Sequence, residues 1–181
     1  MNLPNKLTVL RVFLVPVFVA LLLCNIGIPF QKWIALAVFI IACVTDALDG
    51  KIARKKNLVT NFGRFMDPVA DKLLVCSALI CFIPTGQIWT WIVLIIIARE
   101  LIIDGFRLVA AEQGVVIAAG MWGKIKTTVQ MIMICFLIGN VDHPVFDVIE
   151  KVLIGASLVL SIVSLSEYLI KNRNVLKEKN I

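Results

Sequence analysis

Long apolar segments alternate with short polar connections along the whole chain. Six of these segments approach the ~20 mainly apolar residues that a helix needs to cross a bilayer. They cover residues 7–28, 33–53, 67–83, 88–108, 125–140 and 149–170. Turn-forming residues separate several of them, at Gly27 with Pro29, at residues 84–86 and at residues 140–144. The pattern therefore predicts six helices. Because the connections are short, we expect consecutive helices to run antiparallel to each other.

The composition favours a membrane protein. Hydrophobic residues make up 60% of the 181 residues, only 17% are charged, and the mean hydropathy is +0.97. A soluble domain averages roughly 45–50% apolar residues by a count that includes glycine. We therefore expect an all-α integral membrane protein, with one six-helix bundle over residues 1–181 as its single domain. No small-residue cleavage site follows the apolar run after Arg11, so we expect a first span there and not a signal peptide.

The basic residues predict the orientation of the bundle, because Lys and Arg concentrate in cytoplasmic loops. With the N-terminus inside, only Lys32 and Lys151 fall on the outer side, and Arg99 lies within the fourth segment. Of the 18 basic residues, the remaining fifteen fall at inner ends: Lys6, Arg11, Lys51, Arg54, Lys55, Lys56, Arg64, Lys72, Arg107, Lys124, Lys126, Lys171, Arg173, Lys177 and Lys179. An even number of spans places both termini in the cytoplasm.

The net charge, the cysteines and the single histidine limit which ligands and partners we expect. The net charge of +6 suits an anionic lipid leaflet or a phosphorylated substrate. No aromatic stacking platform accompanies the basic residues, so nucleic acid is not expected as a partner. The five cysteines lie in apolar stretches and form no C-x-x-C pair, which indicates neither a zinc site nor a disulfide framework. His143 stands in a polar connection and is expected to be incidental.

Four aspartates stand close to strongly apolar segments between residues 44 and 75. Asp46 and Asp49 are spaced i, i+3 near the inner end of the second segment, and Asp67 and Asp71 are spaced i, i+4 at the start of the third. Each spacing puts both carboxylates on one helical face. Two antiparallel helices would then direct all four into one cleft, where repulsion raises their pKa values unless a cation neutralises them. An all-oxygen cluster is typical of a site for Mg²⁺ or Mn²⁺.

Structural explanations for these residues remain open. Asp67 before Pro68 is typical of a helix N-cap followed by proline at the first helical position. Basic neighbours such as Lys51 and Arg64 could pair with the acids at the membrane surface, and Gly50 could simply end a helix. These explanations do not account for acids paired in register on two consecutive helices. Acids near a membrane favour a functional site, here a metal-assisted site for a phosphorylated ligand.

The acids and their neighbours match a known pattern. The spacing resembles the signature of the CDP-alcohol phosphatidyltransferases at all eight positions: Asp46-x2-Asp49-Gly50-x2-Ala53-Arg54-x8-Gly63-x3-Asp67-x3-Asp71. Upstream, PNKLTVLR is similar to the N-terminal element of that family, with Asn5, Thr8 and Arg11 at the expected places. The likeness covers essentially the whole chain, including the six-helix plan. Within the family, residues 98–131 are similar to the bacterial phosphatidylglycerophosphate synthases, through A-R-E-L, R-L-V-A-A-E and G-K-I-K-T.

The resemblance implies a transferase of phospholipid biosynthesis at the cytoplasmic face of the cell membrane. CDP-diacylglycerol would donate its phosphatidyl group to sn-glycerol 3-phosphate, and CMP would leave. Two Mg²⁺ or Mn²⁺ ions would be held by Asp46, Asp49, Asp67 and Asp71, and Asp71 would also be the general base. The nucleotide would be contacted by Thr8, Gly50, Ala53, Arg54 and Gly63. The resemblance also implies a homodimer.

The phosphate of the acceptor needs positive charge, because glycerol 3-phosphate is a dianion close to the acids. Arg107 and Lys124 are the main candidates, followed by Arg99 and Lys126. Arginine can bind a phosphate through two hydrogen bonds, and lysine acts as a point charge. Glu100, Asp104 and Arg107 follow i, i+4, i+7, so a structural stripe of ion pairs is the alternative.

Two other functions remain open. The same family would account for a different acceptor alcohol, such as inositol phosphate or serine. A cation channel or transporter belongs to another class and would place acids at the membrane midplane, on helices broken by Gly or Pro. The four aspartates instead gather at one membrane face, and only Glu100 and Asp104 lie nearer the midplane.

Overall fold

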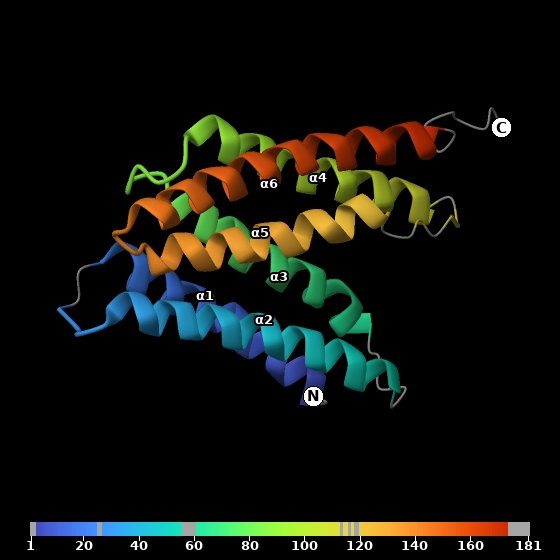
Figure 1. Cartoon of the computed structure of the whole chain (residues 1–181). Coiled ribbons are helices and arrows are strands. Elements are labelled where there is room, and N and C mark those ends of the chain that lie inside the picture. Colours follow the sequence, from blue (N-terminus) through green and yellow to red (C-terminus); the bar gives the residue numbers. More distant parts are fainter. Residues whose placement is uncertain are drawn as a thin grey trace. The chain divides into compact units, whose positions relative to one another are not determined.

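Helices account for all the regular structure that is described. The computed structural model describes residues 3–24, 27–55, 61–112, 114–115, 117 and 120–173, with backbone alone for 3–7, 46–55, 61–65 and 67–68. These residues contain no strand and six helices (Figure 1): α1 Leu3–Leu23, α2 Gln31–Lys55, α3 Asn61–Cys81, α4 Thr90–Glu112, α5 Met121–Gly139 and α6 Pro144–Lys171. The all-α class and the six predicted helices are confirmed.

Several helices extend further at their polar ends than the hydrophobic pattern predicts. α3 begins at Asn61, so Asp67 and Pro68 lie within the helix. The interpretation of Asp67 as an N-cap is therefore wrong. Hydrophobicity marks only the part of a helix that suits an apolar environment, and the first turn of α3 interrupts the apolar pattern with Asn61, Gly63 and Arg64. α1 ends earlier than predicted, at Leu23, and Gly27 follows with a φ of 71° that favours glycine.

The chain divides by its internal contacts into two compact units. The first comprises Met1–Gln87 and Ile134–Val141, and the second comprises Ile88–Met133 and Asp142–Ile181. In the first unit α1 packs against both α2 and α3, and α2 also contacts α3 (Figure 1). In the second unit α4 packs against α6. Whether the chain is one functional domain stays a prediction.

α1 supplies the core of the first unit. Phe18 is fully buried and lies against Phe39 of α2, with ring centroids 5.8 Å apart. Small residues surround this pair on the facing helix, since Ala35 and Ala42 are also buried. Small side chains let two apolar helices approach closely, which is how packing is achieved where lipid removes the hydrophobic driving force between helices.

Side-chain amides and an ammonium group cap helix ends in the first unit. The Gln31 amide donates to the carbonyls of Leu21 (2.6 Å) and Cys24 (2.5 Å), at the end of α1. The Gln87 amide donates to the Leu137 carbonyl at 2.8 Å, near the end of α5. Lys32 Nζ donates to the carbonyl of Asn140 at 3.1 Å. The last turn of a helix leaves carbonyls without intrahelical donors, and these side chains supply them.

His143 has a structural role that the sequence did not reveal. It is the N-cap of α6, where its Nδ1 accepts a hydrogen bond from the Val145 amide at 3.3 Å. Pro144 follows at the first helical position, which needs no amide donor. The expectation that His143 is incidental is therefore wrong for the fold.

The described surface is apolar enough for a membrane environment. Among the described residues, α5 and α6 are long and apolar enough to cross a bilayer, and shorter apolar stretches cover Thr8–Leu23 and Gln31–Thr45. Large hydrophobic side chains are also exposed outside these helices, including Leu94 and Leu101 on α4. Soluble monomers rarely expose apolar surface on this scale. The helices thus support membrane character by length and composition.

Truncating the ring at the centre of the first unit tests this packing. Phe18→Ala is expected to destabilise the protein by about 3–5 kcal/mol, the usual cost of removing a packed phenylalanine ring. Phe13 lies on the same helix but is 70% exposed, so Phe13→Ala is the matched control and is expected to change stability by less than about 0.5 kcal/mol. Thermal unfolding in detergent measures both. Equal losses in the two variants would contradict the assignment of Phe18 to the core.

Candidate active site

Two helices in contact carry the four predicted metal-binding aspartates. Asp46 and Asp49 lie in the second half of α2, and Asp67 and Asp71 lie between the start and the middle of α3. The helical backbone is continuous through both pairs, so each pair keeps the spacing that places it on one face. The side chain of Asp71 is partly buried. The backbone thus meets the first geometric condition for a shared acidic site.

The convergence of these carboxylates stays a prediction. The side chains of Asp46, Asp49 and Asp67 lie outside the described residues, as do those of Gly50, Ala53, Arg54 and Gly63. Among the side chains that are described, no group of three or more His, Cys, Asp or Glu is placed to hold a metal. Three of the four relevant acids are not in that set. The donor set itself consists of carboxylate oxygens alone, which fits a hard divalent ion.

α1 brings its polar residues into the interior of the same unit. Thr8 and Arg11 are buried, with 2% and 3% exposed. Arg11 lines a cavity of about 80 Å³ with Ile41, Ala42 and Thr45 of α2. Thr45 directly precedes Asp46 in the sequence. The N-terminal element therefore lies beside the part of α2 that leads into the acidic positions, which is consistent with its expected place near the nucleotide.

A second polar site lies within the other unit, in a cavity of about 260 Å³ that we call the α4–α6 cavity. Its charged wall residues are Arg99 and Arg107 of α4 with Glu167 and Lys171 of α6. Three cations and one carboxylate leave two positive charges in excess. A doubly charged phosphate monoester would balance that charge.

Two wall residues of the α4–α6 cavity carry polar atoms without hydrogen-bond partners in the described part of the chain. These atoms are Nε of Arg107 and the hydroxyl of Tyr168, and both are buried. The Arg107 guanidinium lies over the Tyr168 ring, 5.8 Å from its centroid, and Phe106 meets the same ring edge-on at 5.9 Å. Buried polar groups are nearly always hydrogen-bonded, so these two atoms mark a part of the wall whose polar groups the described residues do not satisfy.

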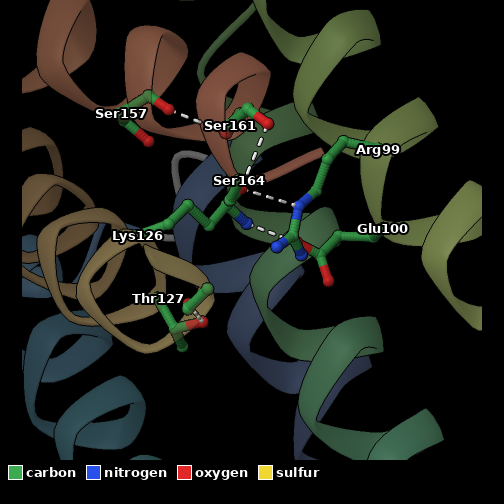
Figure 2. A network of polar contacts seen from close by, with 8 residues as sticks. Arg99, Glu100, Lys126, Thr127, Ser157, Ser161 and Ser164 are labelled. Carbon is green, nitrogen blue, oxygen red and sulfur yellow. Dashed lines mark hydrogen bonds and ion pairs between the residues drawn. The ribbon is translucent and has the colours of Figure 1, made fainter. Parts of the chain in front are cut away.

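Arg99 is fixed on several sides by polar contacts (Figure 2). Its Nε donates to Ser164 Oγ of α6 at 3.2 Å, and its Nη1 donates to Glu100 Oε1 at 2.9 Å. The same Glu100 oxygen accepts from Lys126 Nζ of α5. One carboxylate therefore serves two buried cations, and Arg99 still forms part of the cavity wall.

The four predicted phosphate ligands occupy different environments. Arg99 and Arg107 line the α4–α6 cavity together. Lys126 is only 2% exposed, pairs with Glu100 and is not among the cavity-lining residues. Lys124 is exposed on α5 and does not line the cavity either. The structure thus brings two of the four side chains to one cavity.

α6 contributes cavity residues that the sequence analysis did not select. Glu167, Tyr168, Lys171 and Asn172 all line the α4–α6 cavity. A signal was available, because Glu167 and Lys171 are an i, i+4 charged pair at the end of a strongly apolar helix, and Tyr168 is the only tyrosine of the chain. Lys171 was counted only toward the orientation of the bundle.

Comparisons with known proteins agree with the motif. The family model of the CDP-alcohol phosphatidyltransferases matches residues 1–163. The chain is 41% identical to the CDP-diacylglycerol–glycerol-3-phosphate 3-phosphatidyltransferase of Bacillus subtilis, over 99% of each chain. It is 38% identical to the enzyme of that name from Haemophilus influenzae, covering 93% of this chain and 91% of the relative.

A third relative is named after the product of the reaction. The chain is 38% identical to a probable phosphatidylglycerophosphate synthase of Mycobacterium tuberculosis, over 92% of this chain and 79% of the relative. The family match spans most of the chain, including α2 and α3 with all eight signature positions. By these matches, the chain belongs to the CDP-alcohol phosphatidyltransferase family and is a transferase.

Proposed function

We propose that the protein transfers the phosphatidyl group of CDP-diacylglycerol to sn-glycerol 3-phosphate, forming phosphatidylglycerophosphate and CMP. The observation that carries this proposal is the 41% identity, over 99% of both chains, to a relative whose name states this donor and this acceptor. The excess positive charge of the α4–α6 cavity supports it, since the acceptor carries a phosphate.

The donor is proposed to bind at the inner ends of α2 and α3. Members of this family generally depend on a divalent metal, and we assign two Mg²⁺ or Mn²⁺ ions to Asp46, Asp49, Asp67 and Asp71. Such ions would supply charge neutralisation at the departing phosphate. The nucleotide is assigned to Thr8, Gly50, Ala53, Arg54 and Gly63. The burial of Thr8 on α1, a helix that packs against α2 and α3, supports this assignment.

Asp71 is proposed to be the general base. Its carboxylate would take the proton from the acceptor hydroxyl as that oxygen bonds to the phosphorus that carries diacylglycerol. The bond between this phosphorus and the CMP oxygen breaks, and CMP leaves with the electron pair. A base must stay ionised to accept a proton, and neighbouring cations favour the ionised form of a carboxylate.

The phosphate of the acceptor is assigned to the α4–α6 cavity. Arg107 lines the cavity, and its guanidinium lies over the Tyr168 ring. Arg99 and Lys171 add two further positive charges to the wall. Lys124 and Lys126, predicted from the sequence as ligands, stay candidates without a place in the cavity wall. Glu167 would accept a hydrogen bond from a free hydroxyl of the acceptor, which favours a polyol phosphate.

The membrane arrangement is proposed as six spans with both termini and the active site at the cytoplasmic face, in a homodimer. Exposed tryptophans lie near helix ends, as is typical of membrane interfaces: Trp33 near the start of α2, Trp89 and Trp91 around the start of α4, and Trp122 near the start of α5. The proposed orientation is supported by the basic residues, fifteen of which fall at the predicted inner ends.

A panel of acceptors tests the proposed reaction. The purified protein with CDP-diacylglycerol and Mg²⁺ is expected to release CMP with sn-glycerol 3-phosphate, and not with inositol phosphate or serine. Asp71→Asn is expected to lower the rate by about 10²–10⁴-fold, the usual contribution of a general base. Asp142→Asn, at an exposed position, is the matched control. CMP release with another acceptor alone would redirect the proposal within the family, and cation flux into liposomes that survives Asp71→Asn would favour a transporter.

Substitution of Arg107 tests the acceptor site. Arg107→Met is expected to raise the KM for glycerol 3-phosphate by at least about tenfold, because it removes a charge-assisted pair of hydrogen bonds. Arg107→Lys should fall between this variant and the wild type, since lysine retains the charge but not the planar fork. Initial rates at varied acceptor concentration measure this, with an unchanged KM for CDP-diacylglycerol as internal control. A change confined to the KM of the donor would contradict the assignment.

Metal removal tests the role of the acids. Treatment with EDTA is expected to reduce CMP release to background, and Mg²⁺ or Mn²⁺ should restore it, because the proposed site gathers four carboxylates that require a cation. Radioactive CMP counted after chelation and after readdition of metal is the measurement. Full activity in the presence of excess EDTA would remove the metal from the proposal.

A further inference from the structure

We propose that Glu100, Lys126 and Ser164 are positioning residues that hold the Arg99 guanidinium in the wall of the α4–α6 cavity. In this arrangement Lys126 sets the affinity for the acceptor phosphate through Glu100, without touching the acceptor. The inference rests on the proposed function, in which Arg99 and Arg107 bind that phosphate.

Three helices meet the three nitrogens of Arg99. Nε donates to Ser164 of α6, and Nη1 donates to Glu100 of α4 itself. Nη2 faces Gly123 of α5, where an added Cβ would stand 3.4 Å from it. Two directed hydrogen bonds, together with this close approach of α5, restrict the plane and the rotation of the guanidinium. Arg99 is 7% exposed, so this orientation is set inside the unit and not by solvent.

The Ser164 hydroxyl can face Arg99 in only one way. It donates its single proton to the Ser161 carbonyl at 3.1 Å. A lone pair is then left to accept from Arg99 Nε at 3.2 Å. The Ser161 hydroxyl donates in turn to the Ser157 carbonyl at 2.7 Å, so the buried serines are oriented along α6 (Figure 2). Ser164 is therefore a directed acceptor for Arg99.

Lys126 controls the charge that Arg99 presents. Glu100 Oε1 accepts from both Arg99 and Lys126, and the three groups together carry one positive charge. Without Lys126, Glu100 loses one of these two cations, and the summed charge of Arg99 and Glu100 is zero. An anion would then find Arg99 already neutralised. Lys126 thus preserves the positive charge of the wall although its own side chain is buried away from the cavity.

A charge-compensation experiment separates this role from direct binding. Lys126→Met is expected to raise the KM for glycerol 3-phosphate by roughly tenfold, with the KM for CDP-diacylglycerol unchanged. The double variant Glu100→Gln/Lys126→Met removes both charges and leaves Arg99 positive, so its KM should return toward the wild-type value. Lys126→Arg should restore the KM of the acceptor. Ser164→Ala should raise it roughly fivefold, the effect of losing one oriented hydrogen bond.

Two control variants and a measurement of phosphate binding complete the experiment. The binding measurement does not depend on enzyme activity. Ser166→Ala removes an exposed serine that donates to its own helix at 3.0 Å, and Lys151→Met removes an exposed lysine of α6, so both should leave every KM unchanged. Inorganic phosphate should raise the Tm of the detergent-purified protein, with the shift smaller in Lys126→Met and regained in the double variant.

The outcomes distinguish the inference from the proposed function. The double variant could have a KM as high as that of Lys126→Met and an equally small rise in Tm with phosphate. That result would show that Lys126 contacts the phosphate directly, and would overturn the inference. A Ser164→Ala protein with an unchanged KM and an unchanged rise in Tm with phosphate would overturn the role of Ser164. If the wild type releases no CMP with any acceptor, the proposed function fails. The rise in Tm with phosphate, compared between the wild type and the variants, still decides the positioning roles.

Discussion

The pairing of Glu100 with two buried cations is the interaction on which the second unit depends. A charge transferred from water into an apolar interior costs several kcal/mol unless ion pairs and hydrogen bonds compensate it. Arg99 and Lys126 share one carboxylate, and Ser164 completes the hydrogen bonds of Arg99. Removing any member would leave an uncompensated charge or a misdirected donor. The α4–α6 cavity is thus built around residues whose burial forces them into one arrangement.

The helices were predictable because their signal is local. Each apolar run is long enough to identify a helix, and the turns at Gly27, Gly86 and Asn140 have the positive φ that these residue types allow. Helix ends were less predictable, because hydrophobicity stops where the apolar environment stops. The start of α3 at Asn61 shows this limit, since Asn61, Gly63 and Arg64 interrupt the apolar pattern and are still helical.

The candidate site was predictable only where motif spacing decides it. Eight signature positions on α2 and α3 follow from the chain itself, because i, i+3 and i, i+4 spacings fix a helical face. The α4–α6 cavity depends on the register between α4 and α6, which no spacing along the chain encodes. Lys126 illustrates the difference. The sequence shows that this residue is positively charged, but not whether it pairs with Glu100 or with a ligand. Arg107 was selected for its charge and lines the cavity, whereas Tyr168 beneath its guanidinium was not selected.

The two hydrogen bonds of Gln31 have a consequence for the segment between α1 and α2. Because one amide reaches both Leu21 and Cys24, the beginning of α2 is fastened directly to the end of α1. The packing of α1 against α2 and these two hydrogen bonds hold the two helices together independently of the connection. Insertions or deletions in that connection should accordingly be among the best tolerated length changes in the chain.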